Sequence, residues 1–134
     1  MSVRIRICGG YLENTSRGTR YVGTDGRCVC FVGVRVRRGG WFVPSRVAFQ
    51  FCGRIYVGRK WAGEDFSVLM FAHEYGHFLQ QRELGFWRYL WRVAYPSVLS
   101  VLRDPYGHLH HPVEEDATRR GLRYYYAHAC SEGA

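Results

Sequence analysis

The stretch FSVLMFAHEYGHFLQQREL, residues 66–84, decides the fold of this chain. It contains no helix breaker apart from Gly76, and Gly85, a natural helix end, follows it. Glu64 and Asp65 precede it with the negative charge that the N-terminal end of a helix favours. The pattern predicts one long helix, around which the rest of the chain is arranged.

Within this helix the sequence reads H-E-Y-G-H from His73 to His77. Residues four apart share a helix face, so both imidazoles could reach one zinc ion at about 2.0–2.1 Å. Glu74 lies beside them, where it could take a proton from zinc-bound water, whose pKa the metal lowers to about 7. The alternative is a pair of core histidines with Glu74 in a salt bridge. Burying these groups in so apolar a helix is costly without compensation, which favours the zinc site.

A catalytic zinc site needs a third protein ligand. A third histidine of the metzincin type is absent, because Gln80 and Glu83 stand where that pattern has glycine and histidine, and Glu83 is expected to be exposed to solvent. The best candidate is Glu114, just inside a helix that Pro112 opens. Gly121 lies two turns further along the same stripe, where it would let two helices approach closely.

Four other residues near Glu114 remain alternative ligands: Glu115, Asp116, His110 and His111. Helix geometry turns Glu115 and Asp116 away from the Glu114 stripe by about 100° and 200°, toward solvent or arginines. His108, His110 and His111 fit a surface loop better than the metal site. Tyr124, Tyr125, Tyr126 and His128 follow the helix, as packing aromatics or as a donor to a reaction oxyanion.

Residues 110–121, HHPVEEDATRRG, resemble the second metal-binding segment of gluzincin peptidases, where a carboxylate in an E-x-x-A-D context completes the zinc site. Over about residues 54–126 the chain is similar to small bacterial proteins with HEYGH-x-x-Q, a hydrophobic stretch and a short second helix. The resemblance implies a zinc metallopeptidase, a hydrolase acting on a peptide or protein, with His73, His77 and Glu114 as ligands and Glu74 as general base. It also implies an edge strand at 53–58 that pairs with the substrate.

The resemblance has one departure at Thr118, where the family has aspartate. A threonine hydroxyl can orient a ligand histidine by a hydrogen bond but brings no charge, so we expect Thr118 to support the site with reduced effect.

The remainder of the chain predicts an α+β domain over residues 1–134, of a minimal zincin-like type. Short alternating runs before Gly63 predict a small, mostly antiparallel sheet, with arginines on one face. The predicted strands are 3–8, 27–37, 41–43, 47–51 and 54–57. After the long helix, further helices are predicted at 87–102, interrupted or kinked at Pro96, and from Val113 toward Tyr126.

The segment 85–102 combines aromatic and aliphatic residues with Arg88 and Arg92. It has three interpretations: a core cap or wall of a substrate cleft, peripheral membrane contact through 86–102, or a dimer contact.

Composition limits the function classes. The net charge of +8 comes almost entirely from arginines scattered along the 134 residues, which argues against a nucleic-acid partner although anions would be attracted. Five cysteines without C-x-x-C spacing indicate free thiols and a reducing compartment. With no signal sequence or long apolar run, we expect a cytoplasmic protein. The rival functions are a binding protein with structural zinc and a basic nucleic-acid-binding module.

Overall fold

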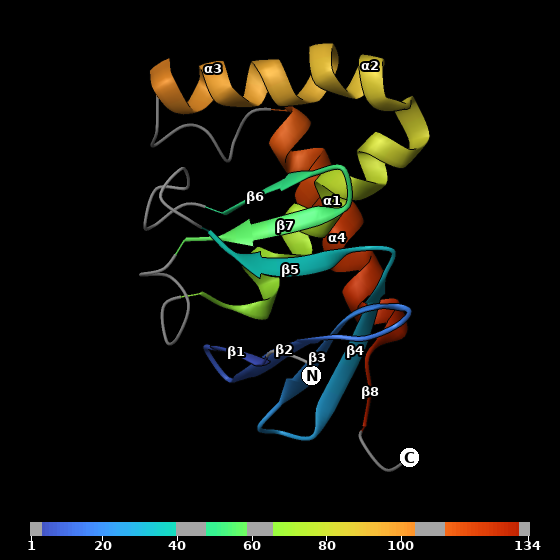
Figure 1. Ribbon diagram of the computed structural model, residues 1–134. Coiled ribbons are helices and arrows are strands. Elements are labelled where there is room, and N and C mark those ends of the chain that lie inside the picture. The colour runs from blue at the N-terminus through green and yellow to red at the C-terminus, as the bar shows by residue number, and fades with distance from the viewer. Residues whose placement is uncertain (1–3, 40–47, 59–65, 104–111, 132–134) are drawn as a thin grey trace.

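The computed structural model describes residues 4–39, 48–58, 66–103 and 112–131 and has the predicted α+β architecture (Figure 1). Two β-sheets lie against a pair of long helices, α1 and α4, and a helical bar crosses one end of the molecule. The single predicted sheet is therefore two sheets.

The first sheet is an antiparallel one, in the order β1-β2-β3-β4-β8. Its strands are Arg4–Ile7, Gly10–Asn14, Gly18–Gly23, Arg27–Val32 and Cys130–Ser131. The predicted alternation holds in β1, where both arginines are exposed and both isoleucines are buried. Strands β2 and β3 were missed because their polar residues and glycines hide the two-residue period.

The second sheet has the order β5-β7-β6, with strands Arg35–Arg38, Arg54–Val57 and Ala48–Phe51. Its first strand comes from the end of the run 27–37, which Gly33, at φ 92°, divides into two strands. Strands β6 and β7 form a hairpin through Cys52 and Gly53, whose φ values of 53° and 80° suit a tight two-residue turn. The predicted strand at 41–43 lies outside the described residues.

The prediction of an edge strand at 53–58 is wrong. Strand β7 lies in the middle of its sheet, parallel to β5 on one side and antiparallel to β6 on the other. Among the described strands, the edge nearer to α1 is β6. The reason is the turn at Gly33, which brings β5 alongside β7.

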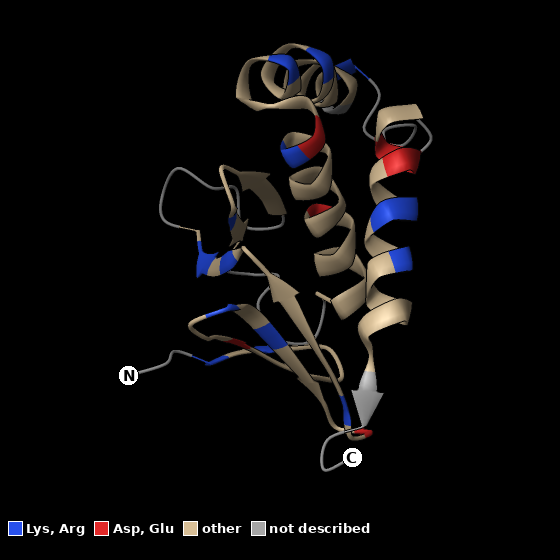
Figure 2. Cartoon of the chain, turned by 90° about the vertical axis from the view of Figure 1, so that its right-hand side faces the viewer, with Lys and Arg blue, Asp and Glu red and all other residues tan. Residues whose placement is uncertain are grey.

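Helix α1 spans Val68–Leu84 and ends at Gly85, as predicted. It starts later than the sequence suggested: Ser67 is the N-cap, and its hydroxyl accepts a hydrogen bond from the Met70 amide. Glu64 and Asp65 lie outside the described residues. Helix α4 spans Pro112–His128 and packs beside α1 (Figure 2).

Between these helices the chain forms the bar: α2 (Phe86–Tyr89), a π-helical turn η1 (Leu90–Ala94) and α3 (Tyr95–Arg103). The predicted interruption at Pro96 takes the form of this wide turn just before it. Proline has no N–H and its ring crowds the preceding turn, which a π-turn accommodates.

One hydrophobic core extends through both sheets and helices α1 and α4. Phe31 on β4 lies at its centre, with edge-on contacts to Phe71 and Tyr75 of α1. Two tyrosine hydroxyls fasten the helices to this strand: Tyr75 donates to the Val32 carbonyl and Tyr124 to the Cys30 carbonyl. Both long helices are thus held at defined positions on β4.

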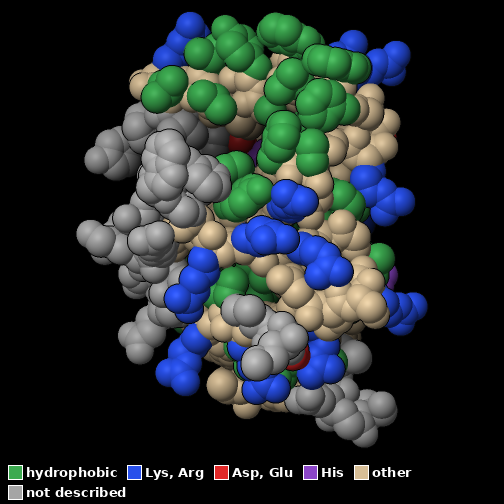
Figure 3. Space-filling model, viewed as in Figure 1, with side chains coloured by type: hydrophobic (Ala, Val, Ile, Leu, Met, Phe, Trp, Pro, Cys, Tyr) green, Lys and Arg blue, Asp and Glu red, His purple; other side chains and the backbone are tan. Residues whose placement is uncertain are grey.

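The outer side of the bar carries exposed hydrophobic side chains (Figure 3). Within the described residues, no helix combines the length and apolar character needed to cross a membrane.

Candidate metal centre

Helix α1 brings the two motif histidines to one place, as the i, i+4 spacing predicts. The rings of His73 and His77 lie edge to face, with centroids 5.0 Å apart. His77 is buried and His73 is partly buried, because α1 has the sheets on one side and α4 on the other. Each imidazole ring is therefore enclosed mainly by protein atoms and not by solvent.

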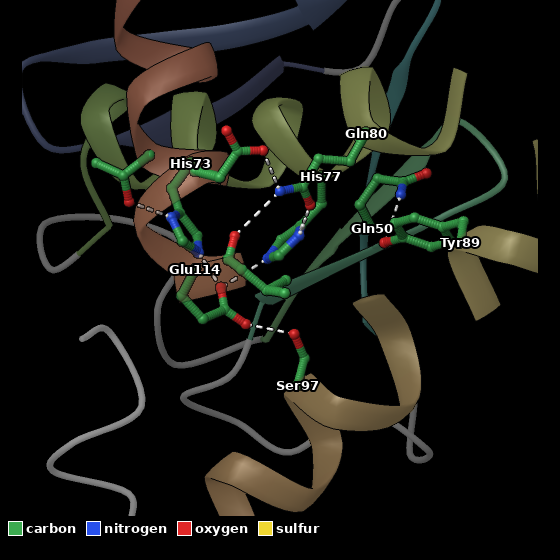
Figure 4. A network of polar contacts seen from close by, with 10 residues as sticks. Gln50, His73, His77, Gln80, Tyr89, Ser97 and Glu114 are labelled. Atoms are coloured by element: carbon green, nitrogen blue, oxygen red, sulfur yellow. Dashed lines mark hydrogen bonds and ion pairs between the residues drawn. The ribbon is translucent and has the colours of Figure 1, made fainter. Parts of the chain in front are cut away.

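Glu114 from α4 lies between these rings (Figure 4). Its Oε2 is 2.8 Å from His73 Nε2 and 2.7 Å from His77 Nε2, and the residue has no exposed surface. Its other oxygen, Oε1, accepts a hydrogen bond from the Ser97 hydroxyl of the bar. Glu114 is thus the carboxylate that faces the histidine pair, as the sequence predicted.

The three donor atoms suit a zinc ion. Ligand bonds of about 2.0–2.1 Å in a tetrahedron put donor atoms about 3.3 Å apart, so separations of 2.7 and 2.8 Å need only a small expansion. Candidate donors of all three residues lie within 4.8 Å of one another. Two imidazoles and one carboxylate also match the donor set of catalytic zinc sites.

Close contact between α1 and α4 makes this meeting of side chains feasible. Each helix has a small pair four residues apart: Ala72 and Gly76 on α1, Ala117 and Gly121 on α4. A Cβ added at Gly76 would lie 1.8 Å from the Ala117 carbonyl oxygen, and one at Gly121 would lie 1.8 Å from that of Ala72. The predicted role of Gly121 is confirmed, and Gly76 has the reciprocal role.

Gln80 fixes the orientation of His77. Its side-chain oxygen is 2.9 Å from His77 Nδ1, while its nitrogen donates to the Val113 carbonyl and to the Asp116 carboxylate. Because both partners of that nitrogen are acceptors, the oxygen must face His77, and His77 Nδ1 must carry a proton. This arrangement leaves Nε2 as the His77 nitrogen that would bind a metal ion.

Thr118 contacts His73 as Gln80 contacts His77. Its hydroxyl is 2.7 Å from His73 Nδ1, one helical turn after Glu114. The contact is made by a neutral partner, so both candidate ligand histidines are hydrogen-bonded to uncharged oxygens.

The charges of the site compensate one another. Burial opposes ionisation of Glu114, but hydrogen bonds from His73 and His77 outweigh it and hold its pKa well below the usual range. Burial likewise opposes protonation of His77, yet the bond to Glu114 and nearby Glu74 raise its pKa to about 9. The buried cluster therefore holds itself together by charge-assisted hydrogen bonds.

Glu74 is partly exposed and is beside the two histidines in sequence. Burial of its carboxyl raises its pKa, while His77 and His73 and a hydrogen bond to the Gln50 backbone act in the opposite direction. That backbone group belongs to β6, so the sheet edge touches the proposed base.

The other sequence candidates lie elsewhere. Glu115 is exposed, and Glu83 is exposed and paired with Arg120. Asp116 contacts Arg119 and Arg120 as expected, but it also holds Gln80, so it is not remote from the site as the sequence suggested. His108, His110 and His111 lie outside the described residues.

The aromatic residues that follow Glu114 lie away from the metal donors. Tyr124 bonds β4 and stacks on His128, Tyr125 is buried in the core, and Tyr126 is exposed. None of them approaches the metal centre as an oxyanion donor in the part of the chain that is described.

Tyr89 of the bar is closer to the site. It is only 3% exposed, and its hydroxyl accepts a hydrogen bond from the Gln50 side chain. Burial raises its pKa, and the charge of Glu74 adds to this, which locates the hydroxyl near the proposed base.

Sequence reasoning missed four residues of this network: Gln50, Gln80, Tyr89 and Ser97. Gln80 had a readable signal, since it stands three residues after His77 on the same helix face. The others come from a strand and from the bar, whose positions the sequence pattern does not specify.

A pocket of about 310 Å³ is lined by Gln80, Asp116, Val93, Arg92 and Arg120 among others. The metal donors do not line it, so we do not assign the substrate to this pocket.

Comparison with known proteins gives no relative: no family model, curated protein or solved structure matches the chain. The gluzincin resemblance stays a prediction that rests on the motif and on the geometry above.

Proposed function

We propose that this protein is a zinc-dependent metallopeptidase, with His73, His77 and Glu114 as zinc ligands and Glu74 as general base. One observation carries the proposal: donors from two helices, 41 and 37 residues apart in sequence, converge on one point. The carboxylate at that point is fully buried between two imidazoles. Such a cluster is costly to bury for structural purposes alone.

When bound, zinc supplies Lewis acidity and lowers the pKa of coordinated water to about 7. Glu74 takes the proton of the attacking water on its carboxylate and returns it to the leaving amine nitrogen. The hydrogen bond to the Gln50 backbone keeps this carboxylate turned toward the sheet edge. His73 and His77 keep their Nε2 atoms directed inward, held by Thr118 and Gln80.

The edge of strand β6 is the place where a peptide substrate would bind. Among the described strands it pairs only with β7, and its Gln50 backbone is next to Glu74. An extended peptide added to this edge would bring its own backbone past the base, which is a common mode of peptide recognition. Tyr89, held by the Gln50 side chain, is a candidate hydroxyl for stabilising a developing oxyanion.

The donor set also favours catalysis over structural zinc. A structural site is closed by four protein ligands, whereas a catalytic one has three and leaves one position open. The described residues supply three donors.

The proposal is tested by metal content and turnover of the full chain. We expect one zinc per chain by native mass spectrometry, removed by chelators, and cleavage in a mixture of quenched fluorescent peptides. Glu74→Gln should retain the zinc and lose about 10²–10⁴-fold in rate, because a general base is removed. Glu115→Gln, an exposed residue, is the matched control. Protein that takes up no zinc at micromolar concentration would refute the enzyme, and loss of zinc in Glu74→Gln would refute the assigned roles.

A further inference from the structure

The bar α2–η1–α3 has two unlike sides. On its outer side Trp87, Trp91, Tyr95, Val98 and Leu102 form a stripe, with exposed fractions of 70%, 65%, 53%, 58% and 74%. On its inner side Tyr89 and Val93 are buried, and Ser97 bonds Glu114. Both sets recur every three or four residues, so the bar has an apolar side toward solvent in addition to the side that it buries against the rest of the molecule.

We call the five outer residues the apolar stripe. Folded proteins rarely leave large hydrophobic side chains adjacent on the surface unless something covers them. In Figure 3 hydrophobic side chains gather along the bar, with basic side chains at both of its ends. Two tryptophans among them are suited to the boundary between lipid headgroups and acyl chains.

The charge of the bar indicates what covers the stripe. Residues 86–103 contain Arg88, Arg92 and Arg103 and no acidic residue, in a chain of net charge +8. All three arginines are exposed. A second copy of the chain would bring these positive charges against their own kind, whereas an anionic lipid surface complements them.

We propose that the apolar stripe binds the surface of an anionic lipid bilayer, with the bar lying in the plane of the headgroups. The bar is too short and too charged to span the membrane, but its length and its Trp–Arg composition suit an interfacial helix. The docked side is the back of the segment that holds Tyr89 and Ser97 at the metal centre. Bilayer binding requires neither metal nor turnover, so it stands or falls independently of the proposed function.

The experiment measures binding of the full chain to vesicles of phosphatidylcholine, with and without phosphatidylglycerol. Sedimentation gives the partition coefficient. The change in tryptophan emission that is lost when Trp87 and Trp91 are replaced reports transfer of these two side chains into a less polar environment. We expect binding to the anionic vesicles, a shift of emission to shorter wavelength, and weakening as salt is added.

Two double variants separate the apolar and electrostatic contributions. Trp87→Ser with Trp91→Ser should lower the partition coefficient at least about tenfold, because two exposed aromatic side chains are removed. Arg88→Gln with Arg103→Gln should lower it roughly thirtyfold on anionic vesicles only. Arg35→Gln with Arg54→Gln, exposed arginines of β5 and β7, is the charge-matched control and should change it by less than about threefold.

Three results would overturn the proposal. The first is failure of the wild-type chain to bind anionic vesicles at low salt. The second is unchanged binding of the tryptophan double variant, with circular dichroism showing intact secondary structure. The third is concentration-dependent dimerisation that the tryptophan substitutions abolish, because the stripe would then belong to a second copy of the chain.

Discussion

Substitution of Gly121 by alanine tests whether the close contact of α1 and α4 builds the metal centre. The added Cβ would lie 1.8 Å from the Ala72 carbonyl oxygen, whereas ordinary contacts begin near 3.4 Å. The backbones would have to separate by roughly 1.5 Å, and zinc ligand distances tolerate only about 0.2 Å. Because His73 follows Ala72 directly and Glu114 lies two turns before Gly121, this separation acts on the donors themselves.

We expect zinc affinity to fall at least about a hundredfold in Gly121→Ala. Overpacking costs about 1–3 kcal/mol and occasionally more, while alanine regains about 1 kcal/mol of helix propensity. A net loss of up to about 2 kcal/mol would lower the Tm of the metal-free protein by up to roughly 10 °C.

Competition with a chromophoric chelator measures the zinc affinity, and calorimetry measures the Tm with and without zinc. Glu115→Ala, exposed on the same helix, is the control and should leave both unchanged. If Gly121→Ala keeps a zinc affinity within about threefold of wild type, the reasoning that helix contact places the donors is refuted.

Three further outcomes follow from the site and the core. Gln80→Leu should lower the zinc affinity about 10–100-fold in a chelator competition, because His77 loses the acceptor that fixes its tautomer. An unchanged zinc affinity would contradict this role of Gln80. Thr118→Val should lower the zinc affinity, and Thr118→Asp should match or exceed the zinc affinity of wild type. The reverse order of affinities in a zinc titration would exclude a supporting role for residue 118. Burial raises the pKa of Tyr21 above its usual 10, so the contribution of this hydroxyl to stability is present below pH 10 and is lost at higher pH. Tyr21→Phe should therefore reduce the fall in the free energy of unfolding at alkaline pH, measured by urea unfolding. An identical fall in wild type and variant would assign the alkaline loss of stability to other groups.

Sequence periodicity predicted the elements in which one face is apolar and the other is polar. Strand β1 alternates arginine with isoleucine, and α1 ends at the glycine that stops it, so both were predictable. Strands β2 and β3 carry polar residues and glycines within the core sheet and gave no such signal. The division of residues 27–37 into two sheets depends on the backbone angle of one glycine, Gly33.

The candidate site divides in the same way. His73, His77 and Glu114 were found because helix spacing and the Pro112 entry restrict where their side chains point. The predicted edge strand failed because strand order is set by non-local pairing, which a local pattern does not contain. Ser97 and Tyr89 are hydrogen-bonded to residues 17 and 39 positions away, so no local pattern could reveal them.

The hydrogen bond from Ser97 to Glu114 joins the bar, whose other side is exposed, to a candidate metal ligand through a single side chain. A second connection runs from Tyr89 through Gln50 to Glu74. Thermodynamic linkage then makes the two events reciprocal: any factor by which a surface bound to the bar changes zinc affinity is the factor by which zinc changes affinity for that surface. Wherever that factor differs from one, a zinc-loaded and a zinc-free chain distribute differently between water and that surface, without any change in the groups that touch it.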